Sequence, residues 1–102
     1  MPELREGDII KLDVTLEKDG FMADAAVTMP FGSVSREKQP LIACAEQVFH
    51  LATQVARASN RVSDIGCVIE SEVHRCGFSV IRELGGHGIG RMIHEPVSCP
   101  PQ

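Results

Sequence analysis

A segment near the start of the sequence alternates between apolar and polar residues, which is the period of a half-buried β-strand. In residues 8–16 one face of the expected strand carries Ile10, Leu12, Val14 and Leu16, and the other carries Lys11, Asp13 and Thr15. A charged turn over 17–20 ends in an Asp-Gly pair, which favours positive φ angles, and a second strand follows over 21–29. The pattern predicts an antiparallel hairpin.

The next two segments change to a helical period. Apolar residues of the first recur at intervals of three and four, and they are Leu41, Ala45, Val48, Ala52 and Val55. This helix is expected to start between Ser35 and Pro40, because proline is accepted in a first turn but not in a helix interior. Ser63 is expected to cap a second helix, and Gly77 to follow its last residue, Cys76.

A third strand is predicted over residues 78–84, and a glycine-rich turn follows it. Residues 85–90 contain four glycines around His87. Glycine lets the backbone turn tightly and approach another segment closely. The spacing differs from the dinucleotide-binding pattern G-x-G-x-x-G, so no nucleotide cofactor is expected. The elements together predict an α+β fold with an antiparallel hairpin, two helices and then a third strand.

Composition narrows the class of protein. The chain has 102 residues, 43% hydrophobic and 24% charged, which is typical of one small folded domain. The net charge of -4 and the absence of Trp and Tyr argue against a nucleic-acid surface. No apolar run approaches the ~20 residues of a membrane span, and no secretory leader is expected. Four cysteines without a C-x-x-C pair indicate reduced, mostly buried thiols in a cytoplasmic protein.

Two aspartates are notable in the hairpin, because Asp is depleted in β-strands. Asp13 and Asp24 are eleven positions apart, so a loop with an even number of residues places both on one face of the sheet. A four-residue loop would put them directly opposite, with Cβ atoms about 4.5–5.5 Å apart, and a two-residue loop would make them diagonal neighbours. Adjacent carboxylates favour a shared proton or cation, and a pair of metal ions is one occupant. Alternatively, both side chains point to solvent beside Lys11 and Thr15.

The histidines are the next candidates for a site. His87, between glycines at the end of the predicted third strand, can present an unobstructed imidazole to a metal. His94 lies seven positions further on, outside the i, i+4 spacing of a helical zinc pair. His50 and His74 fall on the amphipathic helices and are expected at the surface. The residues alone leave open whether His87 is a ligand.

Together these segments resemble the methionine aminopeptidases of the pita-bread metallopeptidase family, which also includes prolidase and aminopeptidase P. The resemblance is carried by Asp13 and Asp24 in the hairpin and by Gly-His-Gly-Ile-Gly-Arg over 86–91, followed by His94 and Glu95. Their order and spacing agree along nearly the whole chain. The fold implied is the middle part of the pita-bread fold.

The resemblance implies a dinuclear site for divalent Co, Mn, Fe or Zn, built from two Asp, one His and two Glu. Asp13, Asp24 and His87 match the Asp and His ligands, and His94 matches a histidine that contacts the substrate and helps to stabilise the transition state. Metals in such a site lower the pKa of a bridging water and polarise the scissile carbonyl. The reaction implied is removal of the initiator methionine from the N-terminus of a peptide or nascent protein.

The two Glu ligands of the family lie further beyond His87 than this sequence extends, and Glu95 is not one of them. We therefore expect a single truncated metallopeptidase-like domain over 1–102 with an incomplete catalytic site. Its three metal donors, Asp13, Asp24 and His87, are expected to hold one ion or none. The alternative is a non-catalytic remnant that binds metal or peptide as a homo-oligomeric module. Because such a remnant leaves apolar surface uncovered, we expect a homodimer, with no nucleic-acid or membrane partner.

Overall fold

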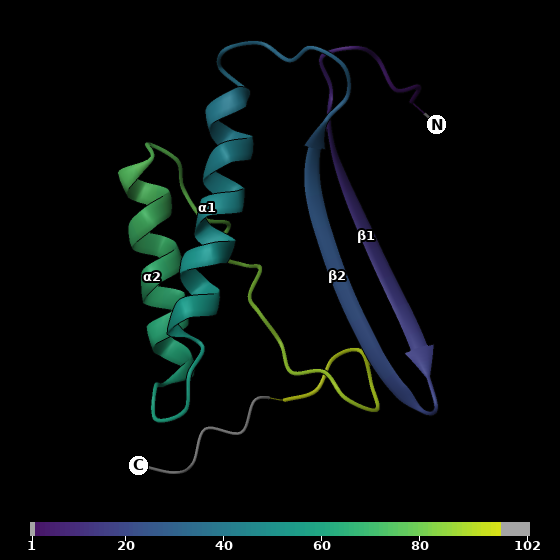
Figure 1. Ribbon diagram of the computed structural model, residues 1–102, viewed down its shortest axis with the longest axis vertical. Helices are drawn as coiled ribbons and strands as arrows, with labels where there is room; N and C mark the ends of the chain where they lie inside the picture. Colours follow the sequence, from purple (N-terminus) through teal and green to yellow (C-terminus); the bar gives the residue numbers. More distant parts are fainter. Residues whose placement is uncertain (1, 97–102) are drawn as a thin grey trace. The chain divides into compact units, whose positions relative to one another are not determined.

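The computed structural model describes residues 2–96, which contain two strands and two helices (Figure 1). In chain order they are β1 (Ile9–Lys18), β2 (Phe21–Pro30), α1 (Gln39–Val55) and α2 (Val62–Arg75). The predicted α+β class, the hairpin and both helices are confirmed. The described residues form two compact units, one of 2–10 and 28–81, the other of 11–27 and 82–96.

A two-residue turn joins β1 to β2, whose ribbons run in opposite directions (Figure 1). Its residues, Asp19 and Gly20, have φ angles of 53° and 83°. Positive φ at both positions is the type I′ turn, which matches the twist of a tight hairpin. The hairpin therefore has the two-residue loop and not the four-residue one.

The strand register follows from the two ends of the hairpin. At the turn Lys18 faces Phe21, and at the open end the amide of Phe31 donates to the carbonyl oxygen of Asp8 at 2.8 Å. Ten residues separate these two positions on each strand. The ladder between them therefore has no net bulge, and the register is the same along its length.

The helices begin close to the positions predicted for them. In α1, Pro40 stands in the first turn, within the expected window. The expected cap of α2 by Ser63 is wrong, because the helix begins at Val62. Instead, the Asp64 carboxylate accepts a hydrogen bond from the Arg61 amide at 2.8 Å and so holds the first turn. Among residues 2–96, neither helix combines the length and apolar character that crossing a membrane requires.

Residues 78–84 form no strand in the described part of the chain, which corrects the predicted third strand. The sheet there consists of β1 and β2 alone, so this segment has no neighbour with which to complete a ladder. Backbone pairing returns further on, as one antiparallel bridge between Gly88 and Glu95. The apolar and β-branched residues of 78–84 suited a strand but could not supply its partner.

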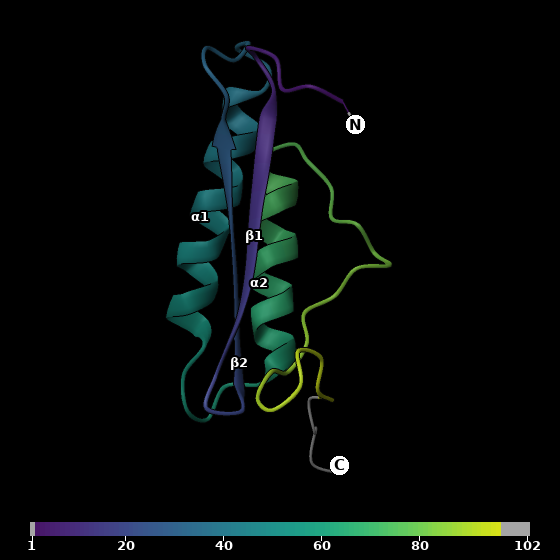
Figure 2. The same cartoon turned by 90° about the vertical axis from the view of Figure 1, so that its right-hand side faces the viewer.

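The antiparallel helices α1 and α2 lie side by side within one unit (Figures 1 and 2). Gly77 follows α2 with a φ angle of 85°, as predicted. Cys44 of α1 is buried, Cys76 at the end of α2 is half-buried, and Cys67 is exposed. The expected burial of the thiols thus holds for Cys44 alone among these three, and Cys99 lies outside the described residues.

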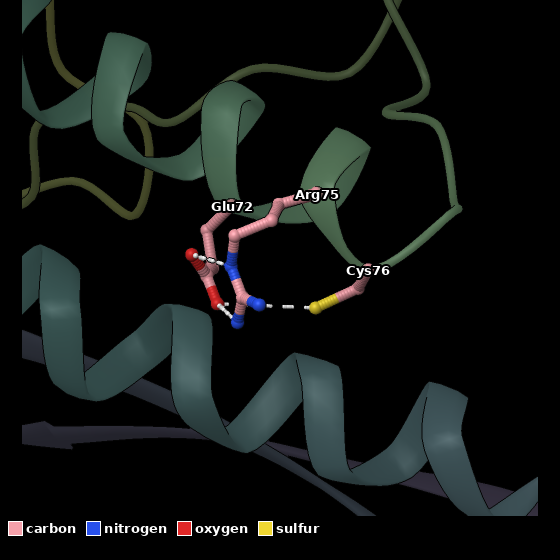
Figure 3. A network of polar contacts seen from close by, with 3 residues as sticks. All are labelled: Glu72, Arg75 and Cys76. Atoms are coloured by element: carbon pink, nitrogen blue, oxygen red, sulfur yellow. Dashed lines mark hydrogen bonds and ion pairs between the residues drawn. The ribbon is translucent and has the colours of Figure 1, made fainter.

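A polar cluster occupies the end of α2. The Arg75 Nε lies 2.9 Å from Glu72 Oε2, and the thiol of Cys76 lies 3.9 Å from Oε1 of the same carboxylate (Figure 3). The guanidinium lowers the pKa of Glu72, and the carboxylate raises the pKa of Arg75. Burial, aided by the neighbouring Cys76 thiol, raises the pKa of Cys44 from 9.0 to about 11.

Cys44 is expected to resist alkylation in the folded protein. With a pKa of about 11 instead of 9.0, its thiol carries ~100-fold less of the nucleophilic thiolate at pH 8. Timed labelling with iodoacetamide, followed by peptide mass spectrometry, should therefore modify the exposed Cys67 first. Comparable rates at the two positions in the folded chain would contradict this, and labelling in urea provides the unfolded control.

Candidate functional site

Asp13, Thr15 and Asp24 lie on one face of the hairpin. In the observed register Thr15 stands directly across from Asp24, and Asp13 lies on the diagonal. The Thr15 hydroxyl donates to Asp24 Oδ1 at 3.1 Å, a contact that this alignment permits. The two carboxylates therefore share a face in the diagonal arrangement, as the two-residue loop requires.

His87 approaches Asp24 from a distant part of the sequence. Its Nε2 lies 3.9 Å from Asp24 Oδ2, and the two side chains are only 33% and 24% exposed. Its Nδ1 lies 2.9 Å from the carbonyl oxygen of Gly88. Because a carbonyl can only accept, this contact places the proton of a neutral ring on Nδ1. The Nε2 lone pair is then left for a cation on the side of Asp24.

Two contacts hold the glycine-rich loop against β2. The amide of Met22 donates to the carbonyl oxygen of Gly90 at 2.6 Å. Beside it, the guanidinium of Arg91 lies 5.5 Å from the centre of the Phe21 ring, within the range of a cation–π interaction. This local anchoring accounts for the proximity of His87 to the strand that carries Asp24.

His94 lies next to His87, with ring centroids 4.2 Å apart and planes inclined by 57°. The exposed His50 and His74 lie on the helices, as predicted. The structure thus brings Asp24, His87 and His94 together in one unit.

Carboxylates and imidazoles are donors that suit the divalent cations implied by the resemblance. Across residues 2–96, however, no three Asp, Glu, His or Cys side chains gather closely enough to hold one ion. Diagonal neighbours in a sheet are about 7–8 Å apart, which explains why Asp13 stands away from the Asp24–His87 pair. The chemistry of these side chains suits a divalent metal ion. Asp24 and His87 form an adjacent pair, and Asp13 provides a further carboxylate on the same face of the hairpin.

Sequence reasoning missed the roles of two residues. It placed Thr15 near the aspartates only as a neighbour on the solvent side, although the Asp-Gly turn already implied the register that pairs it with Asp24. It treated Glu95 only as part of a motif. In the structure, Glu95 Oε1 accepts hydrogen bonds from the amides of Arg91 and Met92 at 2.7 and 3.0 Å.

Residues 2–102 match metallopeptidase family M24. The methionine aminopeptidase of Clostridium perfringens is 41% identical over 98 residues, which cover 96% of this chain and 39% of that protein. Methionine aminopeptidase 2 of Bacillus subtilis is 37% identical over 92 residues, covering 90% of this chain and 37% of that protein.

Solved structures give the same result. The crystal structure of methionine aminopeptidase from Thermotoga maritima matches with a TM-score of 0.88 and 34% identity, covering 91% of this chain and 37% of that one. The chain therefore spans about two fifths of the length of the relatives that it matches.

Proposed function

The chain belongs to metallopeptidase family M24, and from this membership we propose that it carries the Asp, Asp and His part of a methionine aminopeptidase site. The observation that carries the proposal is the pair of Asp24 and His87, whose Oδ2 and Nε2 atoms lie 3.9 Å apart although 63 positions separate the residues. The likeness to methionine aminopeptidases, at 41% identity in one case, supports it.

In this proposal Asp13, Asp24 and His87 are ligands of divalent Co, Mn, Fe or Zn in a dinuclear site. Bound cations of this kind activate a water molecule and polarise the scissile carbonyl. The two aspartates contribute carboxylate oxygens, and His87 contributes Nε2. The contact of His87 Nδ1 with the Gly88 carbonyl orients the ring, which is the usual function of such an outer partner.

We propose that the substrate is a peptide or nascent protein with an N-terminal methionine. The distance of 4.2 Å between the ring centroids of His94 and His87 supports a contact between His94 and a peptide held beside that ligand. An imidazole N–H can donate to the substrate carbonyl oxygen and stabilise the negative charge that develops on it. His94 is therefore assigned as the catalytic residue of this segment.

Thr15→Val is expected to weaken metal binding about 10-fold, while Thr15→Ser retains it. Thr15 holds Asp24 Oδ1 by a hydrogen bond of 3.1 Å, and the loss of such outer-shell partners typically costs 10–100-fold in affinity. Calorimetric titration with Mn²⁺ measures the effect. Equal affinities for Thr15→Val and the unmodified chain would show that the hydroxyl plays no part.

The function is tested by incubating the chain with a Met-Ala-Ser peptide and Mn²⁺ or Co²⁺. Release of methionine by this chain would support the proposal, with the N-acetylated peptide as the uncleaved control. His94→Ala should lower the rate while leaving metal affinity unchanged, because His94 acts on the substrate. An intact peptide together with no bound metal would refute the proposal.

A second candidate is a non-catalytic module that binds one metal ion or a peptide. It is favoured by the absence, among residues 2–96, of any group of three donors. Metal binding that depends on Asp24 and His87 without methionine release would assign this function.

We also propose that the protein is a cytoplasmic homodimer. The apolar face of the hairpin, opposite Asp24, supports association because several of its large side chains are 40–64% exposed; among them are Leu12, Val14, Leu16, Val27 and Met29. Free thiols at Cys44, Cys67 and Cys76 are consistent with a reducing compartment. Light scattering should give twice the 11.1 kDa chain mass, and a monodisperse species at 11.1 kDa would contradict the dimer.

A further inference from the structure

The segment that carries both candidate histidines is closed by a short antiparallel bridge. The Gly88 amide donates to the Glu95 carbonyl at 2.9 Å, and the Glu95 amide donates to the Gly88 carbonyl at 2.8 Å. His87 and His94 each directly precede one residue of this bridge. The closure therefore sets how near the two imidazoles can lie, and their centroids are 4.2 Å apart.

In addition to this bridge, the Glu95 side chain forms hydrogen bonds with the tip of the same loop. Its Oε1 accepts from the Arg91 amide at 2.7 Å and from the Met92 amide at 3.0 Å. Hydrogen bonds from backbone amides to an ionised carboxylate are about twice as strong as neutral ones. One residue thus holds the loop by its backbone at the base and by its side chain at the tip.

The glycines of the loop make room for this arrangement. A Cβ on Gly88 would lie 2.7 Å from the Glu95 carbonyl oxygen, and a Cβ on Gly90 would lie 2.9 Å from Glu95 Oε2. Cβ atoms do not approach a backbone oxygen so closely, so Gly88 is matched to the Glu95 carbonyl, whereas a Cβ on Gly90 would displace the Glu95 carboxylate. The carbonyl of Gly90 also accepts a hydrogen bond from the amide of Met22. This bond links the loop to the strand that carries Asp24.

We infer that Glu95 is a positioning residue that holds His94 beside His87 through the loop amides. The inference rests on the proposed function, since it assigns Glu95 to the orientation of the substrate-contacting histidine. Glu95 is therefore assigned a role different from that of the metal ligands. Across residues 2–96 it joins no group of donors that could hold an ion, and its Oε1 is engaged by the loop.

The test is NMR spectroscopy of the full chain without metal. We expect nuclear Overhauser contacts between the rings of His87 and His94, and slow exchange of the Arg91 and Met92 amides. Glu95→Ala should remove the ring contacts and speed exchange at both amides about 10-fold or more, because a hydrogen bond to a charged group contributes about 1.5–3 kcal/mol. Glu95→Gln retains an acceptor oxygen without the charge, so it should preserve the ring contacts and lower the amide protection less than Glu95→Ala does.

Two further variants keep the test decisive. Glu83→Ala removes an exposed carboxylate near the same loop and should change neither signal. Glu95→Asp keeps the charge, but its side chain is one methylene shorter and should no longer protect the Arg91 and Met92 amides from exchange. This variant provides the test if Glu95→Ala does not fold. Persistence of the His87–His94 contacts in Glu95→Ala, or of amide protection in Glu95→Asp, would overturn the inference. Since no metal or substrate is present, these outcomes are independent of the metal titration and peptide assay that test the proposed function.

Discussion

Asp24→Asn is expected to lower the affinity of the chain for Mn²⁺ by more than about 100-fold, and His87→Ala to do the same. Loss of outer-shell partners alone costs 10–100-fold, so loss of a ligand should exceed that range. Asn keeps the size of Asp and an acceptor oxygen but removes the charge that attracts a divalent ion. These two changes have the largest expected effect because Asp24 and His87 form the closest pair of donors in the site, 3.9 Å apart.

Isothermal calorimetry provides the measurement, and the hairpin provides a matched control. Asp19→Asn removes the same charge from the same hairpin, and Asn tolerates the φ angle of 53° found at that turn position. His74→Ala removes an exposed imidazole from α2. Both controls should bind Mn²⁺ as the unmodified chain does. Affinity that falls equally in Asp19→Asn and Asp24→Asn would show that net charge, and not a site, attracts the metal.

Gly88→Ala is expected to open the bridge between Gly88 and Glu95. The added Cβ would lie 2.7 Å from the Glu95 carbonyl oxygen, so one backbone segment must move. Two backbone hydrogen bonds would be lost, worth about 1–3 kcal/mol together at 0.5–1.5 kcal/mol each. His94 would then leave its position beside His87. The expected readout is loss of exchange protection at the Gly88-position and Glu95 amides, with the hairpin amides unchanged.

Gly86→Ala is the matched control, because a Cβ at Gly86 would meet no atom within 4 Å. It makes the same chemical change two positions away and should leave the bridge amides protected. Equal losses in the two variants would mean that the segment requires glycine for flexibility in general. Retained protection in Gly88→Ala would contradict the close contact itself.

The hairpin could be predicted from sequence because its signals are local, although the sequence left the loop open between two and four residues. Alternation defined the first strand, and in the structure Asp19 and Gly20 supply the positive φ angles of a two-residue turn. That turn also decided which of two arrangements places Asp13 relative to Asp24. The cap of α2 was missed because Asp64 could hold the first turn from within the helix, with its carboxylate bonded to Arg61.

The remaining differences come from contacts between distant segments. Residues 78–84 have the composition of a strand, but a strand needs a neighbour, and none is available in the described sheet. The approach of His87 to Asp24 depends on the bond between Met22 and Gly90, which are 68 positions apart. No local period encodes such a contact. The likeness of the motif to a family indicated the pairing, and the loop geometry provides its physical basis.

We propose above all that Asp24 and His87, with Asp13, form one cation site. Paramagnetic broadening by trace Mn²⁺ tests it most directly, because the ion broadens NMR signals of the nuclei nearest to it. We expect signals of Asp24 and His87 to broaden first and those of Asp13 next, while those of His50 and His74 on the helices stay sharp. Broadening centred on the helices, or none at the hairpin, would contradict it.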